Sequence, residues 1–317
     1  SIDDRNDVTT SNTSSSGQLH PLPADLACAV VLGLGFVLGF LGNIAVIVLK
    51  PNLQHVSPVT QRFVLNLAVL DLLCVLTQPL WIYNVLFSWT LGLEACKFLT
   101  YLTDFSLNGS LMTVTLLSVQ RYLVVVKQLN TLHLFGTDRL LVLLWIASFI
   151  ASIPGCVIQQ LTLDRQKTYC TLQPSTEAAT GMLIEETTVG FIALFVVVFS
   201  YICIYRKVNR AAFFNNPQTT RLVSSIIVTL FVLYGPYLVT NILSVTAVSL
   251  QIKGLQEFCR NSSNIVGSLV LFNSSLNPLL YIFTSCNFCK CSENLNSSGR
   301  NSVFSQRQTN ITTTDAV

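Results

Sequence analysis

The sequence predicts an all-α protein, a bundle of seven transmembrane helices with its N-terminus outside the cell. Composition gives the first support: 51% of the 317 residues are hydrophobic and 10% are charged, whereas a soluble domain has roughly 25% charged residues. The mean hydropathy of +0.59 agrees. The number of apolar stretches and the distribution of basic residues supply the rest of the prediction.

The apolar stretches are long enough to cross a bilayer, which requires about 20 residues each. The predicted spans cover residues 25–49, 60–87, 97–126, 139–158, 182–205, 222–250 and 262–284. They form a membrane domain over 25–285, between an outer tail over 1–24 and an inner tail over 286–317. The outer tail is rich in Ser and Thr and lacks the pattern of a cleaved signal peptide, so we expect the first span to direct insertion.

The basic residues orient the bundle, because lysine and arginine are enriched in cytoplasmic connections. One face of the predicted bundle carries twelve of the 18 basic residues: Lys50, Arg62, Arg121, Lys127, Arg139, Arg206, Lys207, Arg210, Arg221, Lys290, Arg300 and Arg307. This face is predicted to be cytoplasmic. The sequons at Asn12 and Asn261 then lie outside, where glycosylation is possible.

Several functional classes lack support. The net charge of +3 has no basic patch that would favour nucleic acid, and no pair of CxxC motifs has the spacing of a zinc site. The three histidines lie outside the spans and no nucleophile elbow or phosphate loop is present, which disfavours an enzyme. The spans show no internal repeat typical of a transporter. Hydropathy alone does not distinguish this bundle from a channel subunit.

Polar side chains inside the spans mark a candidate site, because an ionisable group at membrane depth is costly and usually functional. Asp71 lies in the middle of the second span with no basic residue near it on that helix. Amide and hydroxyl groups at similar depth are Asn43, Ser110, Asn273, Ser274 and Asn277. We expect these groups to line one buried polar pocket; the alternative is that they only join helices by hydrogen bonds.

Prolines and cysteines add two expectations. Pro79, Pro154, Pro236 and Pro278 fall within spans, where proline removes a backbone hydrogen bond and kinks the helix, so Pro236 and Pro278 are candidate hinges. Cys96 begins the third span on the outer side and Cys170 lies in the following outer connection. An oxidising environment permits a disulfide between them.

The ordered landmarks resemble the rhodopsin-like class of G-protein-coupled receptors over residues 24–290. They are Gly42 and Asn43, "LNLAVLD" ending at Asp71, Trp89, Cys96, Arg121 with Tyr122, Trp145, Cys170, Pro236, and "NPLLY" from Asn277 to Tyr281. Within this class, "LLSVQRYLVV" and "FNSSLNPLLYIFT" are most similar to chemoattractant receptors, and among them to leukotriene B4 receptors.

The resemblance implies an extracellular lipid mediator, leukotriene B4, and an inhibitory-type heterotrimeric G protein. The short inner connection near 209–220 is similar to that of receptors that couple to this type of G protein. It also implies a sodium site at Asn43, Asp71, Ser110, Asn273 and Asn277. The residues that the resemblance implies for G-protein coupling and activation are Gln120, Arg121, Tyr122, Tyr201, Pro236, Pro278 and Tyr281. A short membrane-parallel helix would follow the seventh span, with Cys286, Cys289 and Cys291 as palmitoylation candidates and a Ser/Thr-rich tail for arrestin.

The sequence departs from the family pattern in the motif around Arg121 and in the ligand pocket. The residue before Arg121 is Gln120, where the family has an acid, so we expect measurable basal signalling. The expected ligand-binding residues are Thr100, Thr103, Asp104, Glu186, Tyr234 and Tyr237. The outer half of the spans contains no basic group for a ligand carboxylate unless Lys97, Arg165, Lys167 or Arg260 folds inward. A peptide or cationic ligand is therefore the alternative.

Overall fold

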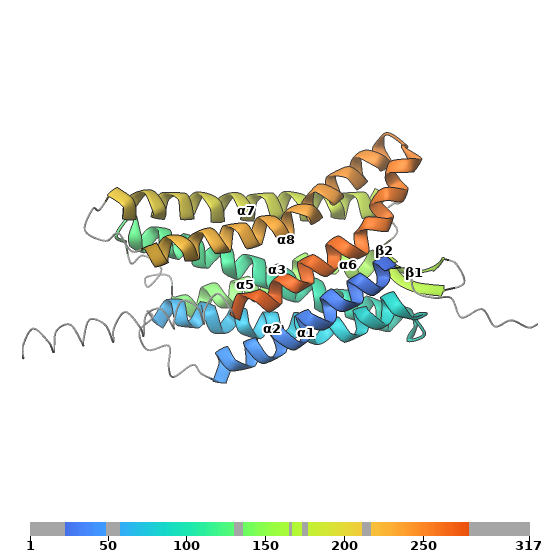
Figure 1. Cartoon of the computed structure of the whole chain (residues 1–317), viewed down its shortest axis with the longest axis horizontal. Coiled ribbons are helices and arrows are strands. Elements are labelled where there is room, and N and C mark those ends of the chain that lie inside the picture. Colours follow the sequence, from blue (N-terminus) through green and yellow to red (C-terminus); the bar gives the residue numbers. More distant parts are fainter. Residues whose placement is uncertain are drawn as a thin grey trace, which may run out of the picture.

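The computed structural model describes residues 23–48, 58–129, 136–164, 167–172, 177–210 and 217–278. These residues form an elongated helical bundle (Figure 1). Its helices are α1 (Pro23–Val48), α2 (Pro58–Leu86), α3 (Gly92–Val125), α5 (Thr137–Ala151), α6 (Ile153–Ile158), α7 (Glu177–Arg210) and α8 (Pro217–Ser249). A final helix covers residues 253–278. Because α5 and α6 together form the fourth span, the bundle has seven spans, as predicted.

The helices are longer than the predicted spans. The third begins at residue 92 rather than 97, and the last begins at residue 253 rather than 262. Hydropathy detects the stretch inside the hydrocarbon layer, whereas backbone hydrogen bonding continues the helix into the polar interface. Five of the described helices are long and apolar enough to cross a membrane by themselves, and α3 is not among them.

The bundle has apolar side chains outside and polar side chains inside, as lipid requires. On α7, Phe191, Phe195 and Phe199 are exposed, whereas Val197 and Ser200 are buried. In α3 the buried set includes many hydroxyl-bearing residues and Gln120. This helix is central, packing against α2, α5, α6 and α7. Its low hydropathy follows from that position.

Close helix contact at α1 depends on glycine. A Cβ atom on Gly42 would lie 2.9 Å from Pro278, and one on Gly39 would lie 2.8 Å from the Ser275 hydroxyl. Ser275 Oγ donates a hydrogen bond to the Gly35 carbonyl at 2.7 Å. Small residues allow helices in a membrane to approach one another in this way, so α1 lies directly against the final helix.

The fourth span is interrupted near its proline. Helix α5 ends at Ala151 and α6 begins at Ile153, with Ser152 between them. Pro154 is the second residue of α6 and has no N–H to continue the hydrogen-bond ladder of α5. Pro79 and Pro236, in contrast, lie inside continuous helices.

A β-hairpin departs from the all-α prediction. Strands β1 (Gln159–Asp164) and β2 (Lys167–Leu172) pair antiparallel after α6. They cap one end of the bundle (Figure 1), which the charge pattern marks as the outer end. Two six-residue strands carry no hydropathy signal comparable to that of a span, so hydropathy does not predict them.

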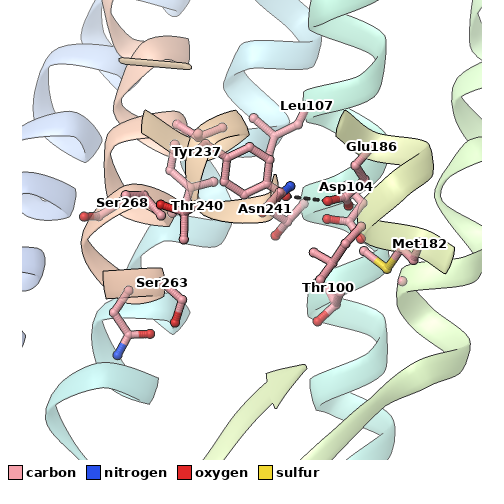
Figure 2. A pocket seen from close by; sticks show the side chains of 18 of the residues that line it. Thr100, Asp104, Leu107, Met182, Glu186, Tyr237, Thr240, Asn241, Ser263 and Ser268 are labelled. Carbon is pink, nitrogen blue, oxygen red and sulfur yellow. Dashed lines mark hydrogen bonds between the residues drawn. The ribbon is translucent and has the colours of Figure 1, made fainter. Parts of the chain in front are cut away.

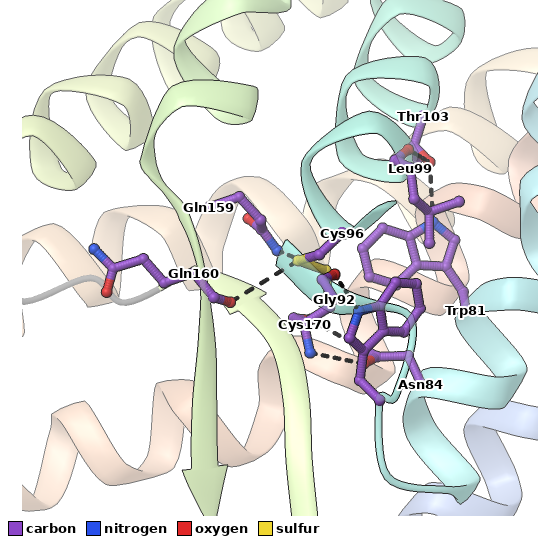
Figure 3. The surroundings of a disulfide bond; sticks show 10 residues. Trp81, Asn84, Gly92, Cys96, Leu99, Thr103, Gln159, Gln160 and Cys170 are labelled. Atoms are coloured by element: carbon purple, nitrogen blue, oxygen red, sulfur yellow. Dashed lines mark hydrogen bonds between the residues drawn. A yellow bond between two sulfur atoms is a disulfide. The ribbon is translucent and has the colours of Figure 1, made fainter. Parts of the chain in front are cut away.

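The hairpin is fixed to the bundle by a disulfide and by hydrogen bonds. Cys96 at the start of α3 is bonded to Cys170 on β2, with a Cα–Cα distance of 5.6 Å (Figure 3). The Asn84 side chain donates to the Cys170 carbonyl at 3.0 Å and accepts from the Cys170 N–H at 2.8 Å. The backbone N–H of Trp89 donates to the Thr168 carbonyl at 2.7 Å. The hairpin therefore forms a fixed wall at the outer end.

Candidate functional site

A cavity of about 360 Å³ opens inside the outer half of the bundle. All six residues expected to bind ligand line it: Thr100, Thr103 and Asp104 on α3, Glu186 on α7, and Tyr234 and Tyr237 on α8. Figure 2 shows several of these side chains converging on one space. The α3 residues recur at helical spacing on one face of the helix, which explains their common orientation.

The acidic wall of the cavity is made by Asp104 and Glu186, which lie next to each other across α3 and α7 (Figure 2). Tyr237 Oη donates a hydrogen bond to Glu186 Oε2 at 2.5 Å. The backbone of Gly155 lies against the Asp104 carboxylate, and a Cβ on Gly155 would clash with it. Within the described part of the chain, the one salt bridge joins Arg62 to Asp138, far along the sequence from both acids. Neither acid is neutralised by a basic side chain there.

A basic residue also lines the cavity. The predicted last span begins at residue 262, which places Arg260 in an outer connection. The structure corrects this: Arg260 lies near the outer start of the last helix and lines the cavity. It remains exposed, so it belongs to the mouth of the cavity. The outer half therefore does contain a basic group within a helix.

Further residues that the sequence did not predict also line the cavity. Gln159, Cys170 and Thr171 of the hairpin line the cavity, as do Thr240 and Asn241 on α8. Asn241 lies four residues after Tyr237, so helical periodicity could have identified it. The hairpin residues had no comparable signal. Trp81 on α2 also lines the cavity and donates its indole N–H to Thr103 Oγ1 at 2.9 Å.

Asp71 lies in a buried polar cluster outside the lining of this cavity. Its side chain is fully buried. Ser110 Oγ donates to Asp71 Oδ1 at 2.7 Å, and Asn277 Nδ2 donates to Asp71 Oδ2 at 2.8 Å. Asn43 reaches the same helix as Asn277 by donating to the Ser274 carbonyl at 3.3 Å. Three of the five residues expected at a sodium site, Asp71, Ser110 and Asn277, are thus joined by hydrogen bonds, and Asn43 bonds the backbone of the helix that carries Asn277.

Asn273, the fifth, is half-buried on the last helix. Among the residues with described placement, no three His, Cys, Asp or Glu side chains gather as they would for a transition metal. The Asp71 cluster instead offers one carboxylate with amide and hydroxyl oxygens, which are hard ligands.

At the inner end, Gln120 and Arg121 differ in their contacts. Gln120 is buried, and its side-chain amide donates to Thr60 Oγ1 on α2 at 3.2 Å. Arg121 is half-buried, and no salt bridge to it occurs among the described side chains. Tyr201 packs with Val197 and Ile204 against Tyr122. The inner ends of α3 and α7 therefore meet through an apolar and aromatic contact.

Some expected residues lie outside the described part of the chain. These are Asn12, Tyr281, Cys286, Cys289 and Cys291, together with the predicted membrane-parallel helix. Asn261 is described and is exposed near the outer start of the last helix. Pro278 is the last described residue and is buried.

The fold and the site together define a class of protein. The profile of the 7 transmembrane receptor (rhodopsin family) matches residues 42–281, so the chain belongs to this family. It is a multi-pass plasma-membrane receptor, not an enzyme, and its partners are an extracellular ligand and a G protein.

Relatives with known names include receptors for lipid and for peptide mediators. Human leukotriene B4 receptor 1 is 30% identical over 286 residues, covering 85% of this chain and 81% of the relative. Human chemokine XC receptor 1 is 28% identical over 274 residues, covering 84% and 80%. Type-1 angiotensin II receptor A of Xenopus laevis is 27% identical over 296 residues, covering 88% and 81%.

Proposed function

We propose that this receptor binds leukotriene B4, a hydroxylated fatty acid, and activates an inhibitory-type heterotrimeric G protein. The observation that carries the proposal is the presence of Arg260 in the lining of a cavity that is otherwise apolar, neutral polar or acidic. A guanidinium is suited to bind a carboxylate through two parallel hydrogen bonds. The likeness to human leukotriene B4 receptor 1 supports the same ligand.

The acidic wall is compatible with such a ligand if the carboxylate stays at the mouth. Arg260 is exposed at the outer end, whereas Asp104 lies about two turns inside α3 from Cys96. A fatty acid with its carboxylate at Arg260 keeps that charge away from Asp104 and Glu186. Its hydroxyl groups can then donate hydrogen bonds to these carboxylates, which only accept when ionised.

A peptide or cationic ligand is the second candidate, and one observation favours it. Asp104 and Glu186 share one cavity without a described basic partner, and a cationic group would relieve their repulsion. Thr100 Oγ1, one turn above Asp104, is also buried without a hydrogen-bond partner. Relatives named for chemokines and angiotensin II are consistent with this candidate.

Inhibition of stimulated cyclic AMP in cells expressing the receptor separates the two candidates. With leukotriene B4, Arg260→Gln should raise the half-effective concentration about 10- to 150-fold, because a charge-assisted hydrogen bond contributes about 1.5–3 kcal/mol. Lys253→Gln is the matched control, since it removes a positive charge from the same helix at an exposed position outside the cavity lining. Arg121→Gln should remove the response.

A receptor that reaches the surface but ignores leukotriene B4 would contradict the lipid proposal. Panels of peptides and amines would then be tested on the wild type and on Glu186→Gln. Loss of a cationic ligand's response in Glu186→Gln would support the second candidate. Equal shifts of the half-effective concentration in Arg260→Gln and Lys253→Gln would mean that Arg260 acts only through its positive charge at the mouth and makes no direct contact with the ligand.

For activation, we propose that Asp71, Asn43, Ser110, Asn273 and Asn277 bind a sodium ion that favours the resting state. Ligand binding shifts the population toward a state in which Arg121 turns toward Tyr201 and Tyr281. Pro236 and Pro278 act as hinges, and Gln120 and Tyr122 flank the coupling arginine. Cys286, Cys289 and Cys291 carry palmitoyl groups, Asn12 and Asn261 carry glycans, and the tail over 286–317 docks arrestin.

A further inference from the structure

The cavity has an apolar extension beyond its acidic wall. On α3, Asp104, Asn108, Leu111 and Met112 lie on one face, because they are separated by four, seven and eight residues. All four line the cavity. Leu111 and Met112 are about 10–12 Å deeper than Asp104 at 1.5 Å per residue. The cavity therefore continues from the acids toward the middle of the bilayer.

Two other helices form the sides of this extension. Met182, Glu186 and Val189 follow one face of α7 at spacings of four and three residues, and each lines the cavity. Ala151 at the end of α5 lines it from the opposite side. We call the space bounded by Leu111, Met112, Ala151 and Val189 the chain groove.

The chain groove includes a side chain that is exposed. Helix α7 packs against α3, α8 and α6, and Gly155 of α6 lines the cavity beside Asp104. Val189 lines the cavity and is still 37% exposed. Ile150 at the end of α5 and Ile192, three residues after Val189, are exposed hydrophobic residues. An exposed apolar residue in the cavity lining points to the space between α5 and α7 as the side on which the groove meets lipid.

The other apolar end of the cavity is closed. There the lining includes Leu32 and Leu271, which pack with Cys74 in a buried cluster. Leu32 is 2% exposed and Leu271 is 8% exposed. An elongated hydrocarbon chain would have to displace this packing, whereas Val189 in the chain groove is 37% exposed.

We propose that the chain groove holds the hydrocarbon chain of the ligand, with the far end of the chain directed between α5 and α7 toward the bilayer. This inference rests on the proposed fatty-acid ligand and adds the position of its apolar part. The carboxylate stays at Arg260, the chain passes Asp104 and Glu186, and its far end leaves the polar part of the cavity. A chain that protrudes there meets lipid tails, which are as apolar as the groove.

Two pairs of matched variants test the chain groove in the cyclic AMP assay, with surface expression measured in each. Ala151→Leu fills the groove from α5, and Ala147→Leu makes the same change one turn away at an exposed position outside the lining. Val189→Trp fills it from α7, and Ile184→Trp is the exposed control on the same helix, outside the lining. Both groove variants should raise the half-effective concentration of leukotriene B4 about tenfold or more, while both controls leave it unchanged.

A ligand of different length identifies the occupant. An analogue that keeps the carboxylate and hydroxyls but lacks the far end of the chain should be affected much less by Ala151→Leu and Val189→Trp. Equal losses for the long and short ligands would overturn the inference, because the groove would then hold a bilayer lipid or only support the fold. A response that shifts in neither groove variant, or in one alone, also overturns it. A silent wild type would instead refute the proposed ligand itself.

Discussion

Gln120 on α3 and Thr60 on α2 join two helices at the inner end by a neutral hydrogen bond. The Gln120 amide nitrogen lies 3.2 Å from Thr60 Oγ1, and the side chain of Gln120 is 4% exposed. The residue beside Arg121 is thus satisfied by α2 and supplies no charge to the arginine. This arrangement leaves Arg121 without a described carboxylate to hold it.

Basal signalling should therefore fall when a carboxylate is placed beside Arg121. We expect Gln120→Asp to lower the ligand-free inhibition of cyclic AMP, because an acid at this position can restrain the arginine by charge. Gln120→Asn is the matched control, since it shortens the side chain equally without adding charge. An unchanged baseline in Gln120→Asp at equal surface expression would contradict the prediction.

Sodium should lower agonist affinity through Asp71. Its carboxylate accepts hydrogen bonds from Ser110 and Asn277 and is fully buried, so a bound cation would favour the packing seen around it. We expect agonist binding to membranes to weaken when sodium chloride replaces choline chloride. Asp71→Asn keeps the shape of the side chain and should abolish this difference. The sodium site would be refuted by a wild type that binds agonist equally in both salts.

Gly155 should be required for the position of Asp104. A Cβ at residue 155 would clash with the Asp104 carboxylate, so Gly155→Ala must displace this acid within the cavity. We expect at least a tenfold loss of ligand potency, in line with the cost of a misplaced group in a binding site. Gly181→Ala is the control, because a Cβ there meets nothing within 4 Å. Similar potency in the two variants would show that the position of Asp104 is unimportant for binding.

Asn84 should stabilise the outer wall of the cavity. Its side chain makes two hydrogen bonds to the backbone of Cys170, and Asn84→Ala leaves both backbone groups without these partners. We expect a loss of about 1–3 kcal/mol in the free energy of unfolding, measured as a lower Tm of the purified receptor. Asn264→Ala, at an exposed position, should leave Tm unchanged. An equal Tm for both variants would mean that the disulfide alone fixes the hairpin.

Much of the fold was predictable because hydropathy is a local property. A run of about 20 apolar residues must cross the bilayer as a helix to satisfy its own backbone, and all seven spans were found in this way. The polar residues Asp71, Ser110 and Asn277 were predicted to meet for a related reason, since buried polar groups in lipid require one another. Family resemblance added the role of each residue, which the physical argument alone left open.

The ends of helices and the outer wall were not predictable from the same signals. Arg260 was assigned to a loop because the last helix extends beyond its apolar stretch, and the hairpin over 159–172 has no hydropathy signature. Gln120 was recognised as unusual, but its partner Thr60 is 60 residues away in the chain. Such pairings depend on how helices rotate and pack.

The sequence by itself predicted a seven-span membrane bundle with a buried carboxylate, an outer pair of cysteines and an arginine at the inner end of the third span, because these follow from local composition and charge. Only the tertiary structure decided that Arg260 shares one cavity with Asp104 and Glu186, that Gly155 accommodates one of these acids, and that the exposed Val189 lines the same cavity. The reason is physical: a cavity is the space left between helices, and its shape depends on their packing, which hydropathy along the chain does not specify.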